Sequence, residues 1–565
     1  MKSSSSIVAG VLILLFLVIN YGHHFIEPNS SGVSGALRTS SLKVSNLKFS
    51  CEKQADYGEE VFQDESINED ERWALSREWF DMALSCDSPV AQTYLGVMYI
   101  YGLGFEKDKE HGISLLRKAK SQGHSQAASS LGDLYAYGDH IEPNWDLAIE
   151  NYKYCSEAGD YYCKAALSEM YTYADEPNYF KAFDLATSAA EAGESRAKGV
   201  LSDLYLNGHG VIKNTEMAIE WAEKGAELGD VLSLEILAYL YIEGIGFPQD
   251  GKKAIELYKK IAEQIAENDD GYAYFEIGEI YYYGLGGIEA DNEKAASYYL
   301  EAARRGDPDG EVAVGEFYWA GIGVGQDSAE AYRWFKRAAD NNHPEGLLNL
   351  GYMYFSGDSS INLSEDDEKA FRYVKKAADL GSAVAMSEVA WSYHRGLGVR
   401  QNNIQAFEYG HSAAERGIPS GKAIIGYLLA TGTGVEKNPT QGIAWLERAA
   451  DYDDPIGLGY LGQAYNSGVG VPENPALAKQ YFERALTAGH VESAAYLGVY
   501  HEFGIETEVD YSHAYAYYDF AARNGSHEAD ELREELSSEM SDSDIETARQ
   551  IRHQLESLLE GVILY

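Results

Sequence analysis

The sequence predicts an all-α fold, an α-solenoid of about twelve antiparallel helix pairs. Three observations predict this fold. A short motif recurs about every 36 residues, an Asp or Asn stands at one fixed place in each copy, and a glycine closes most copies. One helical hairpin cannot bury its apolar stripes, but a stack of hairpins can, and 565 residues are enough for a long array.

The first helix of each copy carries the motif small-x-x-x-Leu-Gly-x-Leu-Tyr, in which the small residue is Ala, Gly, Ser or Cys. In the copy GLGYLGQAY, Leu461, Ala464 and Tyr465 lie at i, i+3 and i+4 and therefore share one helical face. Gly462 has no side chain, so a second helix can approach closely there. The copies begin at Ala91, Ala127, Cys163, Ala197, Ser233, Ala273, Gly310, Gly346, Ala385, Gly421, Gly457 and Ser493.

The second helix of each copy is predicted to begin after a capping Asp or Asn. The side-chain oxygen of such a residue accepts a hydrogen bond from a free backbone N–H, which contributes about 1 kcal/mol. Because the positions recur with the repeat, we interpret them as caps and not as catalytic carboxylates. They are Asp108, Asn144, Asn178, Asn214, Asp250, Asp291, Asp327, Asp366, Asn402, Asn438, Asn474 and Asp510.

The ends of the second helices are marked by glycine, as at Gly489, or by Asn342, which also tolerates a left-handed turn. The fifth copy departs from this pattern, because Ile265 stands at the glycine position and the connection is longer. Insertions of this kind are tolerated best in loops.

The chain is predicted to have four parts. Residues 1–21 contain an uncharged apolar run, 7–19, that is shorter than the roughly 20 residues of a full span, so they form a signal peptide or an N-terminal membrane anchor. Residues 22–70 are predicted to be a flexible acidic linker. Residues 71–525 form the solenoid with an N-terminal capping helix, and residues 526–565 form C-terminal capping helices.

The charge of the chain restricts its partners. Acidic residues outnumber basic residues 90 to 45, which gives a net charge of −45. This negative field repels phosphate backbones, so we predict no nucleic-acid partner. Solvated acidic helix faces are the simplest explanation of the charge, and basic partners or cations are the alternatives.

The four cysteines, Cys51, Cys86, Cys155 and Cys163, fit an exported protein. In an oxidising compartment one or two disulfides are possible, and the spacing alone does not decide which. The chain has no C-x-x-C pair, so the spacing does not indicate a zinc site.

The repeated motif resembles the Sel-one-like repeat family, a relative of the tetratricopeptide solenoids, over about residues 73–525. The resemblance implies a right-handed superhelix of antiparallel helix pairs. It also implies scaffold or adaptor work with protein partners, in signalling, secretion, envelope biogenesis or membrane-protein quality control. The spacing of Cys155 and Cys163 is similar to that of the bridges in cysteine-rich bacterial members, so the resemblance implies one disulfide between them.

The sequence contains no catalytic signature. H-E-x-x-H, a Walker A loop and G-x-S-x-G are all absent from it. Ser-x-x-Lys matches such as those that begin at Ser40 and Ser50 lack the Ser-Asp-Asn and Lys-Thr-Gly motifs that accompany a serine nucleophile. We therefore predict that the protein is not an enzyme and has no cofactor or metal site.

One position of the motif is not needed for the core. The residue x in Leu-Gly-x-Leu-Tyr points away from the two core leucines by helix geometry. In the family that the chain resembles, first helices line the concave side, where exposed aromatic side chains can form a binding hot spot. The alternative is that the aromatic side chains pack on the next repeat. The predicted partner-binding residues are Asp133, Glu169, Asp203, Tyr239, Glu279, Glu316, Tyr352, Trp391 and Tyr427.

These observations favour an exported or membrane-anchored interaction scaffold that binds a protein or peptide segment on its concave face. Its compartment would be the periplasm or a secretory lumen, with the membrane touched only by the N-terminal segment. Binding of carbohydrate or another cell-envelope polymer is an alternative, since acids and tyrosines can line a sugar groove. An envelope hydrolase is a further alternative, although the chain has no motif for it.

Overall fold

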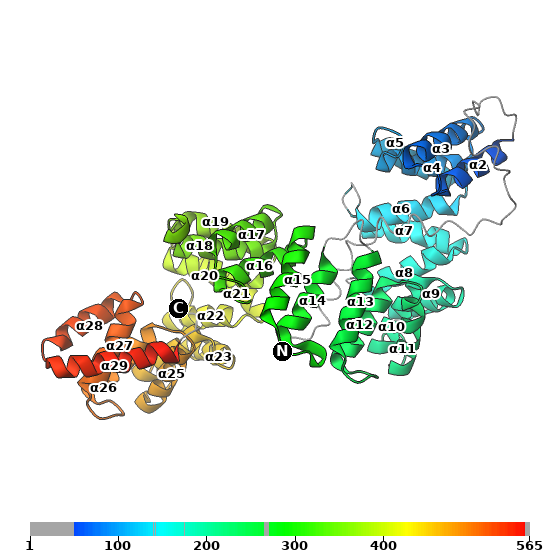
Figure 1. The fold of residues 1–565 in the computed structure, drawn as a ribbon. Coiled ribbons are helices and arrows are strands. Elements are labelled where there is room, and N and C mark those ends of the chain that lie inside the picture. Colours follow the sequence, from blue (N-terminus) through cyan, green and yellow to red (C-terminus); the bar gives the residue numbers. More distant parts are fainter. Residues whose placement is uncertain (1–49, 139–140, 142, 175, 265–270, 560–565) are drawn as a thin grey trace. The chain divides into compact units, whose positions relative to one another are not determined.

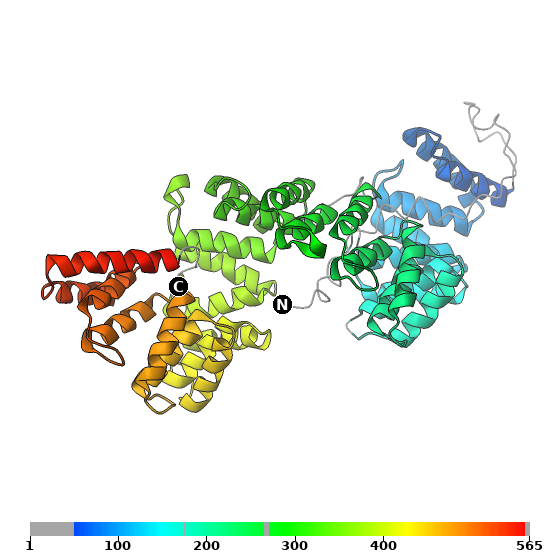
Figure 2. The same cartoon turned by 60° about the horizontal axis from the view of Figure 1, so that its bottom comes forward.

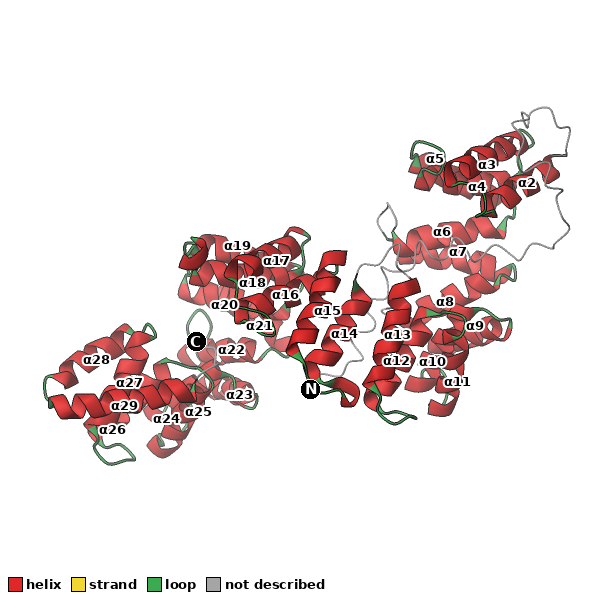
Figure 3. Ribbon diagram, in the orientation of Figure 1, coloured by secondary structure: helices red, strands yellow, loops and turns green. Residues whose placement is uncertain are grey.

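A computed structural model describes residues 50–138, 141, 143–174, 176–264 and 271–559 (Figure 1). These residues form 28 α-helices and no strand (Figure 3). The helices are paired in repeats, and about twelve repeats form a solenoid, so the predicted fold class is confirmed. The contacts among the described helices divide the chain into two compact units. The boundary between them along the chain falls after Gly310.

The first helices of the repeats have nearly equal lengths. They are α4 (Pro89–Tyr101), α6 (Ser125–Tyr137), α8 (Tyr161–Tyr173), α10 (Ser195–Asn207), α12 (Val231–Glu243), α14 (Tyr272–Tyr283), α16 (Pro308–Ala320), α18 (Pro344–Ser356), α20 (Ala383–Arg395), α22 (Pro419–Thr431), α24 (Pro455–Ser467) and α26 (Glu492–Phe503).

The second helices follow after short loops. They are α5 (Lys109–Ser121), α7 (Trp145–Glu157), α9 (Tyr179–Glu191), α11 (Thr215–Ala226), α13 (Gly251–Gln264), α15 (Asn292–Arg305), α17 (Ser328–Asp340), α19 (Asp367–Asp379), α21 (Asn403–Glu415), α23 (Pro439–Ala450), α25 (Pro475–Thr487) and α27 (Tyr511–Arg523). Two short 3-10 turns, η4 (Leu285–Gly287) and η5 (Ser359–Ile361), lie in the connecting loops.

The predicted capping residues all cap the second helices. In α25 the Asn474 side chain accepts a hydrogen bond from the Leu477 backbone N–H, at 3.1 Å. The Asn474 backbone N–H donates to the carbonyl oxygen of Tyr465 in the preceding first helix, at 2.8 Å. The residue therefore starts one helix and ties the loop to the other.

Small residues allow the two helices of a repeat to touch through their backbones. A Cβ on Gly442 of α23 would lie 2.6 Å from the backbone nitrogen of Ala430 in α22. The same Cβ would lie 2.7 Å from the carbonyl oxygen of Gly426. Such distances are far below van der Waals contact, so glycine is required at this crossing.

The N-terminal end of the array differs from the prediction. Helix α3 (Glu69–Leu84) begins near the predicted capping helix, but a further helix, α2 (Cys51–Gln63), precedes it. The linker prediction for residues 22–70 is therefore wrong for this part. The physical reason is that only Ala55, Gly58 and Phe62 of α2 are buried, and the partners of this helix, such as Cys86 and Tyr94, lie far along the chain, where local sequence patterns do not show them. Residues 22–49 lie outside the described ranges.

Two helices close the C-terminal end. Helices α28 (His527–Ser537) and α29 (Asp542–Leu558), red in Figure 2, pack on α27. The carboxylate of Asp519 in α27 is only 3% exposed and accepts hydrogen bonds from Arg523 at 3.0 Å and Arg533 at 2.8 Å. Arg552 of α29 lies 3.5 Å from the same carboxylate. One buried anion thus joins three helices.

Within the described ranges, no helix combines the length and the apolar character that crossing a membrane requires. The predicted signal peptide or anchor, residues 1–21, lies outside these ranges.

The backbone contact at Gly442 is open to a direct test. We expect Gly442→Ala to lower the free energy of unfolding by about 1–3 kcal/mol, because the added methyl group overpacks the α22–α23 crossing. Gly325→Ala is the matched control, since its Cβ would meet no atom within 4 Å. Thermal unfolding followed by circular dichroism should show a loss of a few degrees for the first variant only. Equal melting temperatures for both variants would contradict this packing.

Candidate interaction face

The candidate site is the row of x-position side chains on the first helices, which we call the A-face. The motif fixes the position of each of these side chains on its helix. The leucines on either side of x point toward the core, and the glycine before x allows the second helix to approach closely. The row consists of Val97, Asp133, Glu169, Asp203, Tyr239 and Glu279, followed in the second unit by Glu316, Tyr352, Trp391, Tyr427, Gln463 and Val499.

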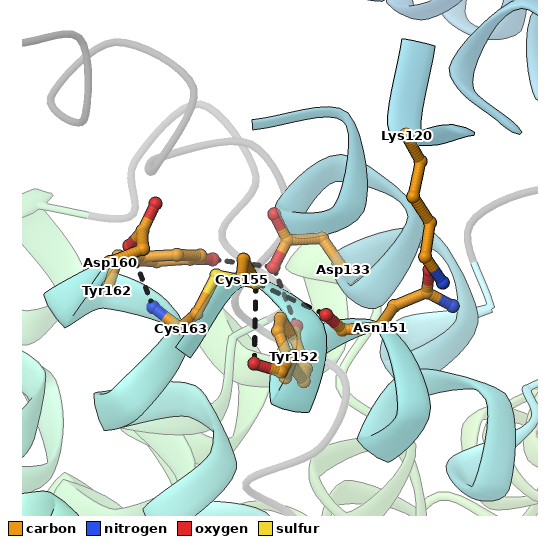
Figure 4. The surroundings of a disulfide bond; sticks show 8 residues. All are labelled: Lys120, Asp133, Asn151, Tyr152, Cys155, Asp160, Tyr162 and Cys163. Carbon is orange, nitrogen blue, oxygen red and sulfur yellow. Dashed lines mark hydrogen bonds between the residues drawn. A yellow bond between two sulfur atoms is a disulfide. The ribbon is translucent and has the colours of Figure 1, made fainter. Parts of the chain in front are cut away.

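The A-face contacts of Asp133 link two neighbouring first helices, as Figure 4 shows. Asp133 of α6 accepts a hydrogen bond from the Tyr162 hydroxyl of α8 at 2.6 Å. It also accepts one from the Tyr152 hydroxyl of α7 at 2.7 Å. Burial raises the pKa of Asp133, and the two tyrosine hydrogen bonds oppose this rise.

Arg196 supplies the next link. Its guanidinium, on α10, forms an ion pair with Glu169 of α8 and donates a hydrogen bond to the Tyr137 hydroxyl of α6. Arg196 is only 5% exposed. A buried charge is tolerated when it is paired and hydrogen-bonded, so this residue ties three successive first helices together.

The remaining acids have partners within their own repeat or in the next one. The Glu279 carboxylate accepts a hydrogen bond from the Tyr299 hydroxyl at 2.6 Å, within one repeat. The Asp203 carboxylate accepts from the Asn207 amide at 2.7 Å. The exposed Glu316 accepts from the Asn349 amide of α18 at 3.0 Å. Most of the acidic side chains of the row are thus partly buried and engaged.

The aromatic residues of the second unit form a packed cluster. Trp391 is one of the predicted partner-binding residues, with packing on a neighbouring repeat as the alternative, and its 6% exposure favours the packing alternative. Its ring stacks on that of Tyr460, two repeats later, with centroids 6.3 Å apart. The Arg395 guanidinium lies over it at 5.4 Å. The Tyr427 ring is half-buried and lies 4.4 Å from the Tyr460 ring.

Tyr352 and Tyr239 are partly buried rather than fully enclosed. The Tyr352 hydroxyl donates a hydrogen bond to Glu388 of α20 at 3.2 Å. Burial raises the pKa of Tyr239, and the charge of Glu243 raises it further.

The sequence reasoning missed the residues that meet the A-face from the next first helix. They stand three or seven residues before x in their own motif, and hence on the same helical face. Their fixed spacing from x is visible in the repeat, so the sequence pattern could have identified them. These residues are Tyr162, Arg196, Asn349, Glu388 and Tyr460.

A buried carboxyl group, Glu235, and a half-buried one, Glu276, lie near the A-face of the first unit. Burial raises the pKa of Glu235 on α12 to about 8, and the charges of Glu276 and Asp230 add to the rise. Burial likewise raises the pKa of Glu276 on α14 to about 7, with a further contribution from Glu279. In the described part of the chain no group of three His, Cys, Asp or Glu residues is arranged to hold a metal ion.

Two disulfides cross-link the described helices. One joins Cys155 of α7 to Cys163 of α8, with Cα atoms 5.9 Å apart, and so ties the second repeat to the third (Figure 4). The other joins Cys51 of α2 to Cys86 just after α3. Disulfides indicate an oxidising compartment outside the cytoplasm.

These features define a helical-repeat protein, and comparison with known families specifies which kind. The Sel1 repeat model matches most of the chain, so the chain belongs to the Sel1 repeat family and the resemblance drawn from the motif is confirmed. The matched segments are residues 89–124, 125–160, 162–194, 199–230, 232–264, 271–307, 308–343, 344–382, 383–418, 421–453, 456–490 and 491–526.

Solved structures of this kind are similar. A protective antigen of uropathogenic Escherichia coli with an SLR fold is 24% identical, with 85% of this chain and 94% of that chain covered and a TM-score of 0.43. A Sel1 repeat protein from Oxalobacter formigenes is 30% identical, with 56% and 90% covered and a TM-score of 0.35.

A short stretch of the chain is similar to a plant protein. It is 36% identical over 64 residues to the ERAD-associated E3 ubiquitin-protein ligase component HRD3A of Arabidopsis thaliana. The match covers 11% of this chain and 9% of that protein.

The carboxyl groups of Glu235 and Glu276 predict a pH dependence of stability. A carboxyl whose folded-state pKa is raised favours the fold while it is protonated, so this stability is present below about pH 4.5 and is lost as the pH rises through about 7–8. We expect Glu235→Gln to raise the free energy of unfolding at pH 8.5 by about 2–4 kcal/mol and to have little effect near pH 4.5.

Urea unfolding of the variant and the parent protein at both pH values measures this difference. Glu263→Gln, at an exposed position of α13, is the matched control. A stabilisation by Glu235→Gln that is equal at both pH values would show that the carboxyl charge is not the cause.

Proposed function

We propose that the protein is an interaction scaffold that binds a protein or peptide segment on its A-face, without chemistry of its own. The observation that carries the proposal is the repeat array. Core positions keep the same residue types from copy to copy, whereas the x position varies among acids, aromatics, Gln and Val. A surface that varies on a constant frame suits recognition of one irregular partner.

We propose that the scaffold works in the periplasm or a secretory lumen. The two disulfides support an oxidising compartment. The apolar run at residues 7–19 supports export, either with cleavage or with retention as a single-pass anchor.

The chemistry of the chain also supports a polypeptide partner. The net charge of −45 disfavours nucleic acid and favours a partner with basic surface. The similarity to a component of a ubiquitin-ligase complex supports a role within a multiprotein assembly, although it covers a small part of the chain.

A pair of double variants tests the proposal. Tyr239→Ala/Glu316→Ala removes one A-face side chain in each unit, and we expect it to weaken partner capture about tenfold or more. Because Tyr239 packs on the core and Glu316 accepts a hydrogen bond from Asn349, we also expect the melting temperature to fall by a few degrees, so affinity is measured well below it. Phe180→Ala/Tyr452→Ala is the matched control, since these side chains are 76% and 66% exposed away from the A-face.

Partners are first captured from a membrane-containing extract with the full chain and identified by mass spectrometry. Their affinity for each purified variant is then measured by calorimetry. A control variant that loses the partner while the A-face variant keeps it would place binding elsewhere and would reject the proposal.

A further inference from the structure

The two disulfides lie in opposite environments. Both Cys155 and Cys163 are 0% exposed. The sulfur of Cys155 lies 3.3 Å from the carbonyl oxygen of Asn151, inside α7 (Figure 4). Cys86 is exposed in the turn after α3, and Cys51 is half-buried. A dissolved thiol can therefore reach the Cys51–Cys86 bond, whereas the Cys155–Cys163 bond is enclosed.

The position of Cys51 also favours exchange. Cys51 is the first residue of α2, directly after the N-cap residue Ser50. The free N–H groups at a helix N-terminus stabilise a thiolate, and a more stable thiolate leaves a disulfide faster. The charged neighbours in sequence, Glu52 and Lys53, have opposite signs and largely offset each other.

Helix α2 is the first described helix of the array, and the Cys51–Cys86 bond adds a covalent link to its packing on α3. Only Ala55, Gly58 and Phe62 of its 13 residues are buried, and an isolated helix of that length is marginal in water. The Phe62 ring lies 4.9 Å from the Trp73 ring of α3, and α2 also contacts α4 of the first repeat. The Phe62 and Tyr94 rings lie 5.1 Å apart, and the Tyr94 hydroxyl donates to Glu59 at 2.9 Å.

We infer that Cys51–Cys86 is a thiol-exchange site for a dithiol reductant and that its reduction releases α2 from α3 and from the first repeat. One thiolate of the reductant attacks the exposed Cys86 sulfur, forms a mixed disulfide, and displaces Cys51 as a thiolate that takes up a proton. The second thiol of the reductant then attacks its own half of the mixed disulfide and frees Cys86. The reductant leaves as a disulfide, and the chain gains two thiols.

The consequence of exchange is local. Release of α2 uncovers the Phe80 ring, which packs on Gly58, and one side of Tyr94. The Cys155–Cys163 bond and the repeats that it joins keep their cross-link. This inference does not rest on the proposed function, because it concerns the end of the array and not the A-face.

Graded reduction of the folded full-length chain tests the inference. The protein is incubated with increasing dithiothreitol, alkylated with iodoacetamide and digested, and the labelled cysteines are counted by mass spectrometry. We expect Cys51 and Cys86 to be labelled at a dithiothreitol concentration at least about tenfold below that needed for Cys155 and Cys163. Labelling of all four at the same concentration would overturn the assignment.

Hydrogen exchange measures the structural consequence. After selective reduction, we expect backbone amides of residues 51–63 to lose protection while those of residues 125–173 keep it. Unchanged protection of residues 51–63 would overturn the release of α2. Cys51→Ser/Cys86→Ser should reproduce the reduced state, with Cys155→Ser/Cys163→Ser as the control. Should the first variant fail to fold, the reduction of the folded parent protein decides both points.

Discussion

The close contact between the two helices of each repeat constrains the rest of the structure. Where Gly442 meets Gly426 the helices touch backbone to backbone, and no large side chain fits between them. In other repeats the motif glycine makes room for a buried aromatic ring of the second helix, as Gly132 does for Tyr152. The x side chains lie outside this crossing and reach the next repeat, as in the pairing of Asp133 with Tyr162 and of Tyr352 with Glu388. The A-face is consequently a set of links between repeats as well as a surface.

This dual role has consequences for the binding that we propose at the A-face. Residues that are already held by neighbours, such as Glu169 beside Arg196, lose little side-chain freedom when a partner arrives. A partner that contacts the A-face also contacts the joints between repeats, so binding and solenoid stability should be linked. The carboxyl groups of Glu235 and Glu276 add a dependence on pH to that stability in the first unit.

Local patterns were enough to predict the helices, their caps and the order of repeats. Asn474 and its equivalents could be predicted because a capping side chain acts on its own backbone. Helix α2 could not be predicted, since it is held by a disulfide to a cysteine 35 residues away and by buried residues that contact α3 and α4. Packing of Trp391 was one of two alternatives that the motif allowed, but its partner could not be predicted, because Tyr460 stands two repeats later and spacing within one motif carries no such information.

A-face side chains couple successive repeats through buried pairs such as Glu169 and Arg196. A double-mutant cycle measures this coupling, with Glu169→Gln, Arg196→Met and the double variant unfolded in urea. We expect a coupling energy of about 1–3 kcal/mol, because the ion pair is buried and joins α8 to α10. Additive effects, with a coupling energy near zero, would contradict this coupling.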